Sequence, residues 1–199
     1  MIKILEILKN MSTRWGTLQT FLFGPVMAIG FTDTVSLTGV FLFGTFDTTE
    51  NDYRDTYKYK TKRRDLDIAL NFRLNDYFKL FGGIKYIGID QTMWGWGHYG
   101  VGPAFGLGFT APMSENLFLL GNISYFYLSG TEWNDDTDEY DTNDYGINAT
   151  LSLAYYINPI TLSLGVRYQY VVTTYDDSDE DITTKFYGIT LAATYSFNI

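Results

Sequence analysis

GHYGVGPAFGLGFTA, residues 97–111, alternates strictly between two kinds of side chain. One phase is mostly bulky and apolar: Tyr99, Val101, Pro103, Phe105, Leu107 and Phe109. The other phase is small or polar: His98, Gly100, Gly102, Ala104, Gly106, Gly108 and Thr110. Because successive side chains of a β-strand point to opposite faces, this stretch predicts a strand with one bulky apolar face and one small polar face.

The same alternation divides the chain into nine strands, which read as four hairpins and a final strand. The predicted strands cover residues 17–31, 35–46, 64–74, 77–89, 97–111, 117–129, 145–157, 160–174 and 183–199. Short turns at 32–34, 75–76, 112–116 and 158–159 alternate with longer polar stretches at 47–63, 90–96, 130–144 and 175–182. An all-β, antiparallel up-and-down barrel with short turns at one end and long loops at the other is therefore expected.

The faces decide the environment of this barrel. A soluble barrel would crowd Phe, Tyr and Leu into a narrow lumen and leave Gly, Ser, Thr and Asn outside, whereas soluble surfaces are roughly a quarter to a third charged. Turning the apolar face to lipid removes both problems. No run of about 18 uncharged apolar residues predicts a membrane helix, and the net charge of −9 argues against nucleic-acid binding. The sequence thus predicts a transmembrane β-barrel.

The final strand carries the pattern that makes a family resemblance specific. Its apolar phase runs through Tyr187, Ile189, Leu191, Ala193, Tyr195, Phe197 and Ile199. In this, residues 17–199 resemble the small outer-membrane β-barrel proteins of Gram-negative bacteria, of the porin-like or OmpA-like type, although these typically end in an aromatic residue. The resemblance implies location in the bacterial outer membrane. It also implies membrane lipid, lipopolysaccharide and the outer-membrane assembly machinery as partners, without a cofactor.

The strand number and the N-terminus leave alternatives open. Barrels of this kind have even strand numbers, so nine strands predict a ten-stranded full-length parent lacking its first strand here, or eight strands with one segment misread. Residues 1–14 are predicted to be a short helix or a ragged start, and residues 15–199 the barrel. Residues 23–25 and 30–32 resemble 101–103 and 108–110, and β-bulges are expected at Pro25 and Pro103 because proline cannot donate to the ladder.

The inward phase predicts a polar lumen. Its expected lining residues are Asp65, Asp67, Asn71, Arg73, Lys79, Lys85, Asn122, Asn148, Arg167 and Gln169. Both charge signs occur, so we expect ion pairs and hydrogen bonds that fill the interior; a conducting pore is the alternative. Aromatic girdles are expected where the barrel wall meets the two membrane interfaces. Their predicted members are Trp15, Trp94, Trp96, Trp133, Tyr155, Tyr195 and Phe197.

The long loops carry strongly charged clusters. Weak candidates for a divalent cation site are Asp135, Asp136, Asp138, Asp176, Asp177 and Asp179, although no EF-hand spacing is present. A basic cluster in the first long loop is expected to meet lipopolysaccharide phosphates or the acidic loops. It comprises Lys58, Lys60, Lys62, Arg63 and Arg64.

Catalysis is not expected. His98 is the only histidine, and its sequence neighbours form no catalytic motif. The function predicted is a porin-like or structural barrel with a narrow polar lumen. The alternatives are a surface-binding protein or adhesin acting through the acidic loops and, behind it, a barrel hydrolase.

Overall fold

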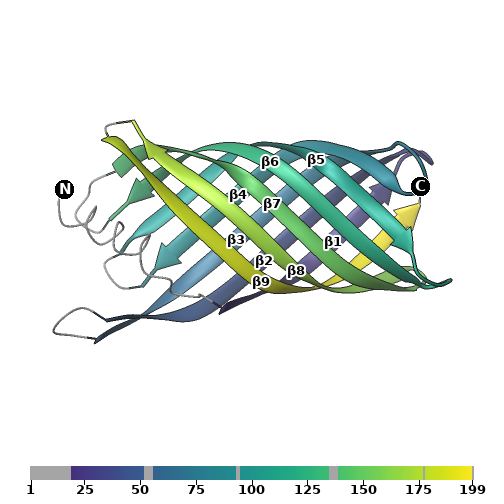
Figure 1. Cartoon of the computed structure of the whole chain (residues 1–199), viewed down its shortest axis with the longest axis horizontal. Helices are drawn as coiled ribbons and strands as arrows, with labels where there is room; N and C mark the ends of the chain where they lie inside the picture. The colour runs from purple at the N-terminus through teal and green to yellow at the C-terminus, as the bar shows by residue number, and fades with distance from the viewer. Residues whose placement is uncertain (1–18, 52–55, 93–94, 135–138, 177, 199) are drawn as a thin grey trace.

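The computed structural model describes residues 19–51, 56–92, 95–134, 139–176 and 178–198, which form a single closed β-barrel (Figure 1). Its nine strands are β1 (Gln19–Gly30), β2 (Val35–Asn51), β3 (Thr56–Arg73), β4 (Phe78–Gln91), β5 (Gly97–Pro112), β6 (Leu117–Trp133), β7 (Glu139–Ile157), β8 (Ile160–Tyr175) and β9 (Ser178–Asn198). None of the described residues belongs to a helix long and apolar enough to cross a membrane. The predicted N-terminal segment, residues 1–14, lies outside the described residues.

All nine predicted strands are present, and each neighbouring pair from β1–β2 to β8–β9 is antiparallel. The barrel closes where β1 lies parallel to β9, with Gln19 opposite Tyr187 and Gly30 opposite Asn198. Parallel closure follows from an odd number of strands in an up-and-down order. The nine-strand barrel is confirmed, while the number of strands in a longer parent stays a prediction.

The long polar stretches are shorter as loops than predicted, because the strands continue into them. The ladder between β2 and β3 extends to Asn51 opposite Thr56, and that between β6 and β7 to Trp133 opposite Glu139. These polar segments keep a two-residue period and are rich in Thr and Tyr, which favour strands. We call this end of the barrel the loop end and the other the turn end.

The apolar phase faces outward, as predicted. Tyr99, Val101, Phe105 and Leu107 are 40%, 46%, 59% and 50% exposed along β5, whereas His98 on the opposite phase is 6% exposed. Outward apolar residues on other strands include Ile68, Ile84, Ile123, Leu151, Leu164, Val166, Ile189 and Leu191. These outward apolar residues form a belt around the barrel, which we call the apolar belt. The side chains of the opposite phase point into the barrel.

The bulges predicted at Pro25 and Pro103 are wrong. Pairing is interrupted at each proline on one side, but the register on either side of the gap is unchanged, and the register shift in the described ladders lies instead between Thr173 and Tyr175. The residue before each proline is a glycine. A Cβ on Gly24 or Gly102 would lie 1.8 or 2.1 Å from a carbonyl oxygen of the adjacent strand. Glycine thus lets that strand approach without an extra residue.

Candidate functional site: the barrel lumen

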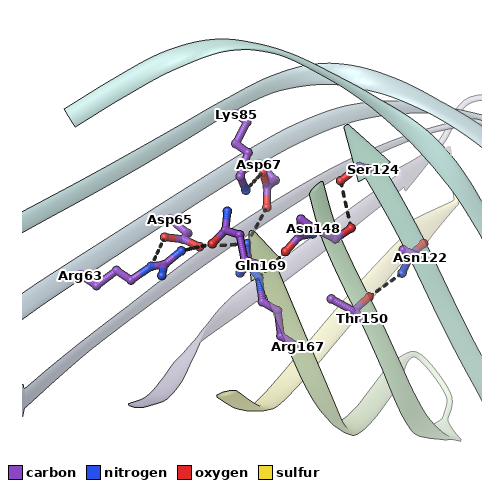
Figure 2. Close-up of polar contacts among 10 residues, drawn as sticks. All are labelled: Arg63, Asp65, Asp67, Lys85, Asn122, Ser124, Asn148, Thr150, Arg167 and Gln169. Carbon is purple, nitrogen blue, oxygen red and sulfur yellow. Dashed lines mark hydrogen bonds and ion pairs between the residues drawn. The ribbon is translucent and has the colours of Figure 1, made fainter. Parts of the chain in front are cut away.

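A network of charged side chains crosses the lumen midway along the barrel (Figure 2). We call it the waist network. Its members are Arg63, Asp65 and Asp67 from β3, Lys85 from β4, and Arg167 and Gln169 from β8. Because β3 and β8 are not neighbours in the barrel, these side chains meet across the interior.

Asp65 is the centre of the waist network. Arg63 Nε donates to Asp65 Oδ1 at 2.8 Å and Arg63 Nη2 to Asp65 Oδ2 at 3.1 Å. Arg167 Nη2 forms an ion pair with Asp65 Oδ2 at 2.9 Å. The side chains of Arg63 and Asp65 are each 1% exposed. The single negative charge of Asp65 is thus shared between two buried guanidinium groups, those of Arg63 and Arg167.

A second carboxylate, Asp67, pairs with Lys85. Lys85 Nζ donates to Asp67 Oδ1 at 2.6 Å, and Arg167 Nη2 lies 3.9 Å from Asp67 Oδ2. Arg167 Nε also donates to Asn148 Oδ1 at 2.6 Å, and Arg63 Nη2 donates to Gln169 Oε1. The network therefore links β3, β4, β7 and β8.

An apolar cluster lies beside the waist network inside the lumen. It comprises Ile87, Phe126, Leu128 and Val171, with Ile89, Ala104 and Phe186 packed against it. Phe126 and Leu128 are each 0% exposed. The Arg63 guanidinium carbon lies 3.8 Å from the centroid of the Phe186 ring, and Lys85 Nζ 5.7 Å from that of Phe126. Apolar packing and cation–π contacts thus fill space between the charged groups.

A small cavity lies beside the waist network. A cavity of about 10 Å³ is lined by Arg63, Arg167 and Gln169 together with Leu22 and residues 186–190 of β9. A volume of this size holds about one water molecule. The described side chains therefore obstruct the lumen at this level.

The turn end of the lumen is lined differently. Asn122 Nδ2 donates to Thr150 Oγ1 at 3.2 Å (Figure 2) and Asn71 Nδ2 to Thr38 Oγ1 at 3.1 Å, so neutral groups satisfy one another here. A cavity of about 230 Å³ lies among the short turns, bordered by Asn71, Lys79 and residues 32–36 among others. This cavity is much larger than the one at the waist.

A third group of polar side chains lies toward the loop end. His98 Nε2 lies 2.7 Å from Asp144 Oδ2, and His98 Nδ1 lies 3.9 Å from Glu132 Oε2. Tyr175 donates its hydroxyl to Glu132 Oε2 at 2.7 Å, and Thr173 donates to Asp144 Oδ1 at 2.6 Å. We call these five residues the outer clamp, because they tie β5, β6, β7 and β8 together.

Most predicted lumen residues point inward, but they do not form one set. Asp65, Asp67, Lys85, Arg167, Gln169 and Asn148 meet at the waist, whereas Asn71, Lys79 and Asn122 lie toward the turn end. Arg73 departs from the prediction: its side chain is 53% exposed and pairs with Asp76 in the adjoining turn.

Two features of the lumen were missed from the sequence. Arg63 belongs to the predicted basic loop cluster, yet its side chain points into the lumen and the residue is 1% exposed. Extending the phase of Asp65 and Asp67 by one step would have found it. The carboxylates around His98 come from other strands, so no local spacing reveals them, although the pairing of His98 with Glu132 follows once the β5–β6 register is known.

The predicted girdle residues occupy several positions. Tyr155 and Tyr195 are 48% and 44% exposed near the turn end, and Trp133 lies against the outward Tyr99 with ring centroids 5.8 Å apart. Trp96 instead stacks on His98 and buries its Nε1, so we do not assign it to the girdle. Trp15 and Trp94 lie outside the described residues, as does the side chain of Phe197.

The predicted cation site falls mostly outside the structure. Asp135, Asp136, Asp138 and Asp177 are not described, nor is the side chain of Asp179. Asp176 is exposed and accepts a hydrogen bond from Asn143 at 3.3 Å. Within the described part of the chain, no group of three or more acidic, histidine or cysteine residues is arranged to hold a metal ion.

The polar side chains inside the described part of the barrel are therefore largely buried and paired with one another. Comparison with models of known protein families finds no match for this chain, and a search of curated proteins finds no relative.

Proposed function

We propose that this protein is an integral β-barrel of a bacterial outer membrane, with a lumen closed at the waist, and that its role is structural. In this role the barrel anchors and presents its loop end. The observation that carries the proposal is the apolar belt. Ile84 is 60% exposed, Phe105 59% and Leu164 58%, while Arg63, Asp65 and Lys85 are 1% exposed inside. Large apolar side chains outside and charges inside suit lipid and oppose water.

The length of the belt supports this proposal. Along β5 the outward apolar phase runs from Tyr99 to Phe109, and along β8 from Ile160 to Tyr170. Each covers about the 9 to 11 residues that a tilted strand needs to cross the hydrocarbon layer.

Charge at the loop end supports an orientation in which this end lies at the outer leaflet of the membrane. On β3 the outward phase changes from Ile68 and Leu66 to Arg64, Lys62 and Lys60, all three of which are exposed. Arg64 pairs with Asp90 of β4 at this boundary. Basic side chains at the rim of an apolar belt are placed to contact lipid phosphates, which we propose are those of lipopolysaccharide in the outer leaflet.

The waist network favours a structural barrel over a porin. Paired charges, the apolar cluster and the small waist cavity obstruct the lumen, so the closed form fits the geometry better than an open channel. No catalytic step belongs to the proposal, because His98 is enclosed by the outer clamp and by Trp96.

Refolding into vesicles tests the proposal. Chain unfolded in urea is diluted into phosphatidylcholine vesicles or into buffer alone. We expect folding only with lipid, flotation with the vesicles after a carbonate wash, and faster migration of the unheated than of the boiled sample in detergent gels. A folded monomer in lipid-free buffer would contradict membrane insertion. In planar bilayers the inserted protein should be silent, and regular conductance steps would contradict the closed waist.

A further inference from the structure

The waist network contains buried hydrogen-bond donors that no protein acceptor satisfies. Arg63 Nη1, Arg167 Nη2 and Gln169 Nε2 have no hydrogen-bond partner, although Arg167 Nη2 does form the ion pair with Asp65. The three residues are 1%, 7% and 0% exposed. Buried donors of this kind are uncommon, because leaving them unsatisfied destabilises the folded state.

These three residues border one cavity. Arg63, Arg167 and Gln169 all line the space of about 10 Å³ at the waist. They come from β3 and β8, and Figure 2 shows their side chains converging inside the barrel. The remaining wall carries no charged side chain and comes from Leu22 and residues 186–190 of β9. The unsatisfied groups therefore face a common space rather than separate gaps.

The charge balance of the waist points in the same direction. The ion pairs join three cations, Arg63, Lys85 and Arg167, to two carboxylates, Asp65 and Asp67. One positive charge is therefore in excess, and the three cations are at most 7% exposed. An uncompensated buried charge is strongly unfavourable.

We infer that the waist binds one small monovalent anion of halide type between Arg63, Arg167 and Gln169. Such an ion neutralises the excess charge and accepts hydrogen bonds from all three donors at once. A water molecule accepts only two hydrogen bonds and leaves the charge unchanged. The cavity of about 10 Å³ is the size of one water molecule. A chloride ion is slightly larger than water, so it binds here with a small outward shift of the lining side chains, and bulky organic anions are excluded.

Unfolding in two salts tests this inference. The protein is folded in uncharged detergent micelles, or in buffer if it proves to need no detergent, so the test does not depend on membrane insertion. Urea unfolding is followed in sodium chloride and in sodium gluconate at equal ionic strength. At chloride 100-fold above the dissociation constant, the unfolding equilibrium constant should fall about 100-fold relative to gluconate. Equal stability in the two salts would overturn the inference.

Substitution of Gln169 supplies the decisive variant. Gln169→Glu keeps the side-chain shape, places a carboxylate beside the two arginines and removes the excess positive charge. We expect its chloride dependence to disappear. The matched control is Asn122→Asp, the same change of amide to carboxylate beside Thr150 toward the turn end, which should keep the chloride dependence. An unchanged chloride effect in Gln169→Glu would place the ion elsewhere and overturn the site.

A direct measurement covers the case in which a variant does not fold. Crystals of the unchanged protein grown in sodium bromide should show an anomalous scattering peak in the waist cavity. Equivalent density without an anomalous signal identifies water there and would contradict the inference.

Discussion

The waist and the turn end of the same lumen are lined by different kinds of side chain. At the waist, charged groups from strands far apart in sequence are buried against one another, with Asp65 1% exposed between two arginines. At the turn end, neutral amides and hydroxyls such as Asn122 and Thr150 pair with each other beside a cavity of about 230 Å³. The first region holds distant strands together, whereas the second leaves space.

This difference indicates which part of the lumen contributes most to the free energy of unfolding. Removing one partner of a buried ion pair leaves an uncompensated charge and costs far more than removing a neutral hydrogen bond. Substitutions at the waist should therefore weaken the barrel strongly, and equivalent changes toward its exposed ends should not.

Asp65→Asn should have the largest effect. It leaves Arg63 and Arg167 without their shared carboxylate, and we expect about 3 to 5 kcal/mol of lost unfolding free energy, measured by urea titration in micelles. The matched control is Asp90→Asn, which breaks the exposed pair with Arg64 and should cost no more than about 1 kcal/mol. Equal losses in the two variants would remove the distinction between waist and rim.

Phe126→Ala should come next. Phe126 is 0% exposed in the apolar cluster, and its truncation should cost about 3 kcal/mol in the same titration. Phe81→Ala provides the comparison, because Phe81 is only half-buried nearer the turn end and should lose less. A larger loss at Phe81 would reverse the proposed order of the two regions.

Leu164→Arg extends the comparison from the lumen to the outer wall. Leu164 is 58% exposed in the belt, and an arginine there should cost about 2 kcal/mol if lipid surrounds it. Folding yield and unfolding free energy in phosphatidylcholine vesicles measure the effect. The control, Lys62→Arg, keeps the charge on the exposed basic rim and should be neutral. No penalty at Leu164 would argue for water around the belt.

Tyr175→Phe should have the smallest effect. It removes the 2.7 Å hydrogen bond to Glu132 in the outer clamp, at an expected cost of about 1 kcal/mol. Tyr155→Phe, on an exposed tyrosine near the turn end, should be neutral in the same titration. A loss much above that of a single hydrogen bond would show that the whole clamp depends on this hydroxyl.

The fold could be predicted from the sequence because alternation is a local signal. In residues 97–111 and 160–174, the alternation of side chains shows which residues lie on each face of the strand. The short turns show which strands are neighbours. The loop-end limits of the strands could not be predicted. Segments such as residues 56–63 alternate between two sets of mainly polar side chains, so no apolar phase shows that the strand continues through them. The prediction of bulges at Pro25 and Pro103 was wrong because the glycine before each proline leaves space for a carbonyl oxygen of the neighbouring strand.

The site was only partly predictable. Alternation alone places Asp65, Lys85 and Arg167 in the lumen, but their meeting depends on how β3 and β8 face each other across the closed barrel. The same holds for His98 and Asp144, which are separated by β6. Contacts across a barrel depend on strand tilt and closure, and neither is written in a two-residue period.

The central claim is that lipid surrounds the apolar belt, and spin labels test it most directly. The chain has no cysteine, so single cysteines report unambiguously. Labels at Val101, Phe105, Leu164 and Val166 in vesicles should be accessible to oxygen and shielded from a water-soluble nickel chelate. A label at Lys60 or Lys62, beyond the belt, should show the reverse. Belt labels as accessible to the chelate as the label at Lys60 would contradict the account.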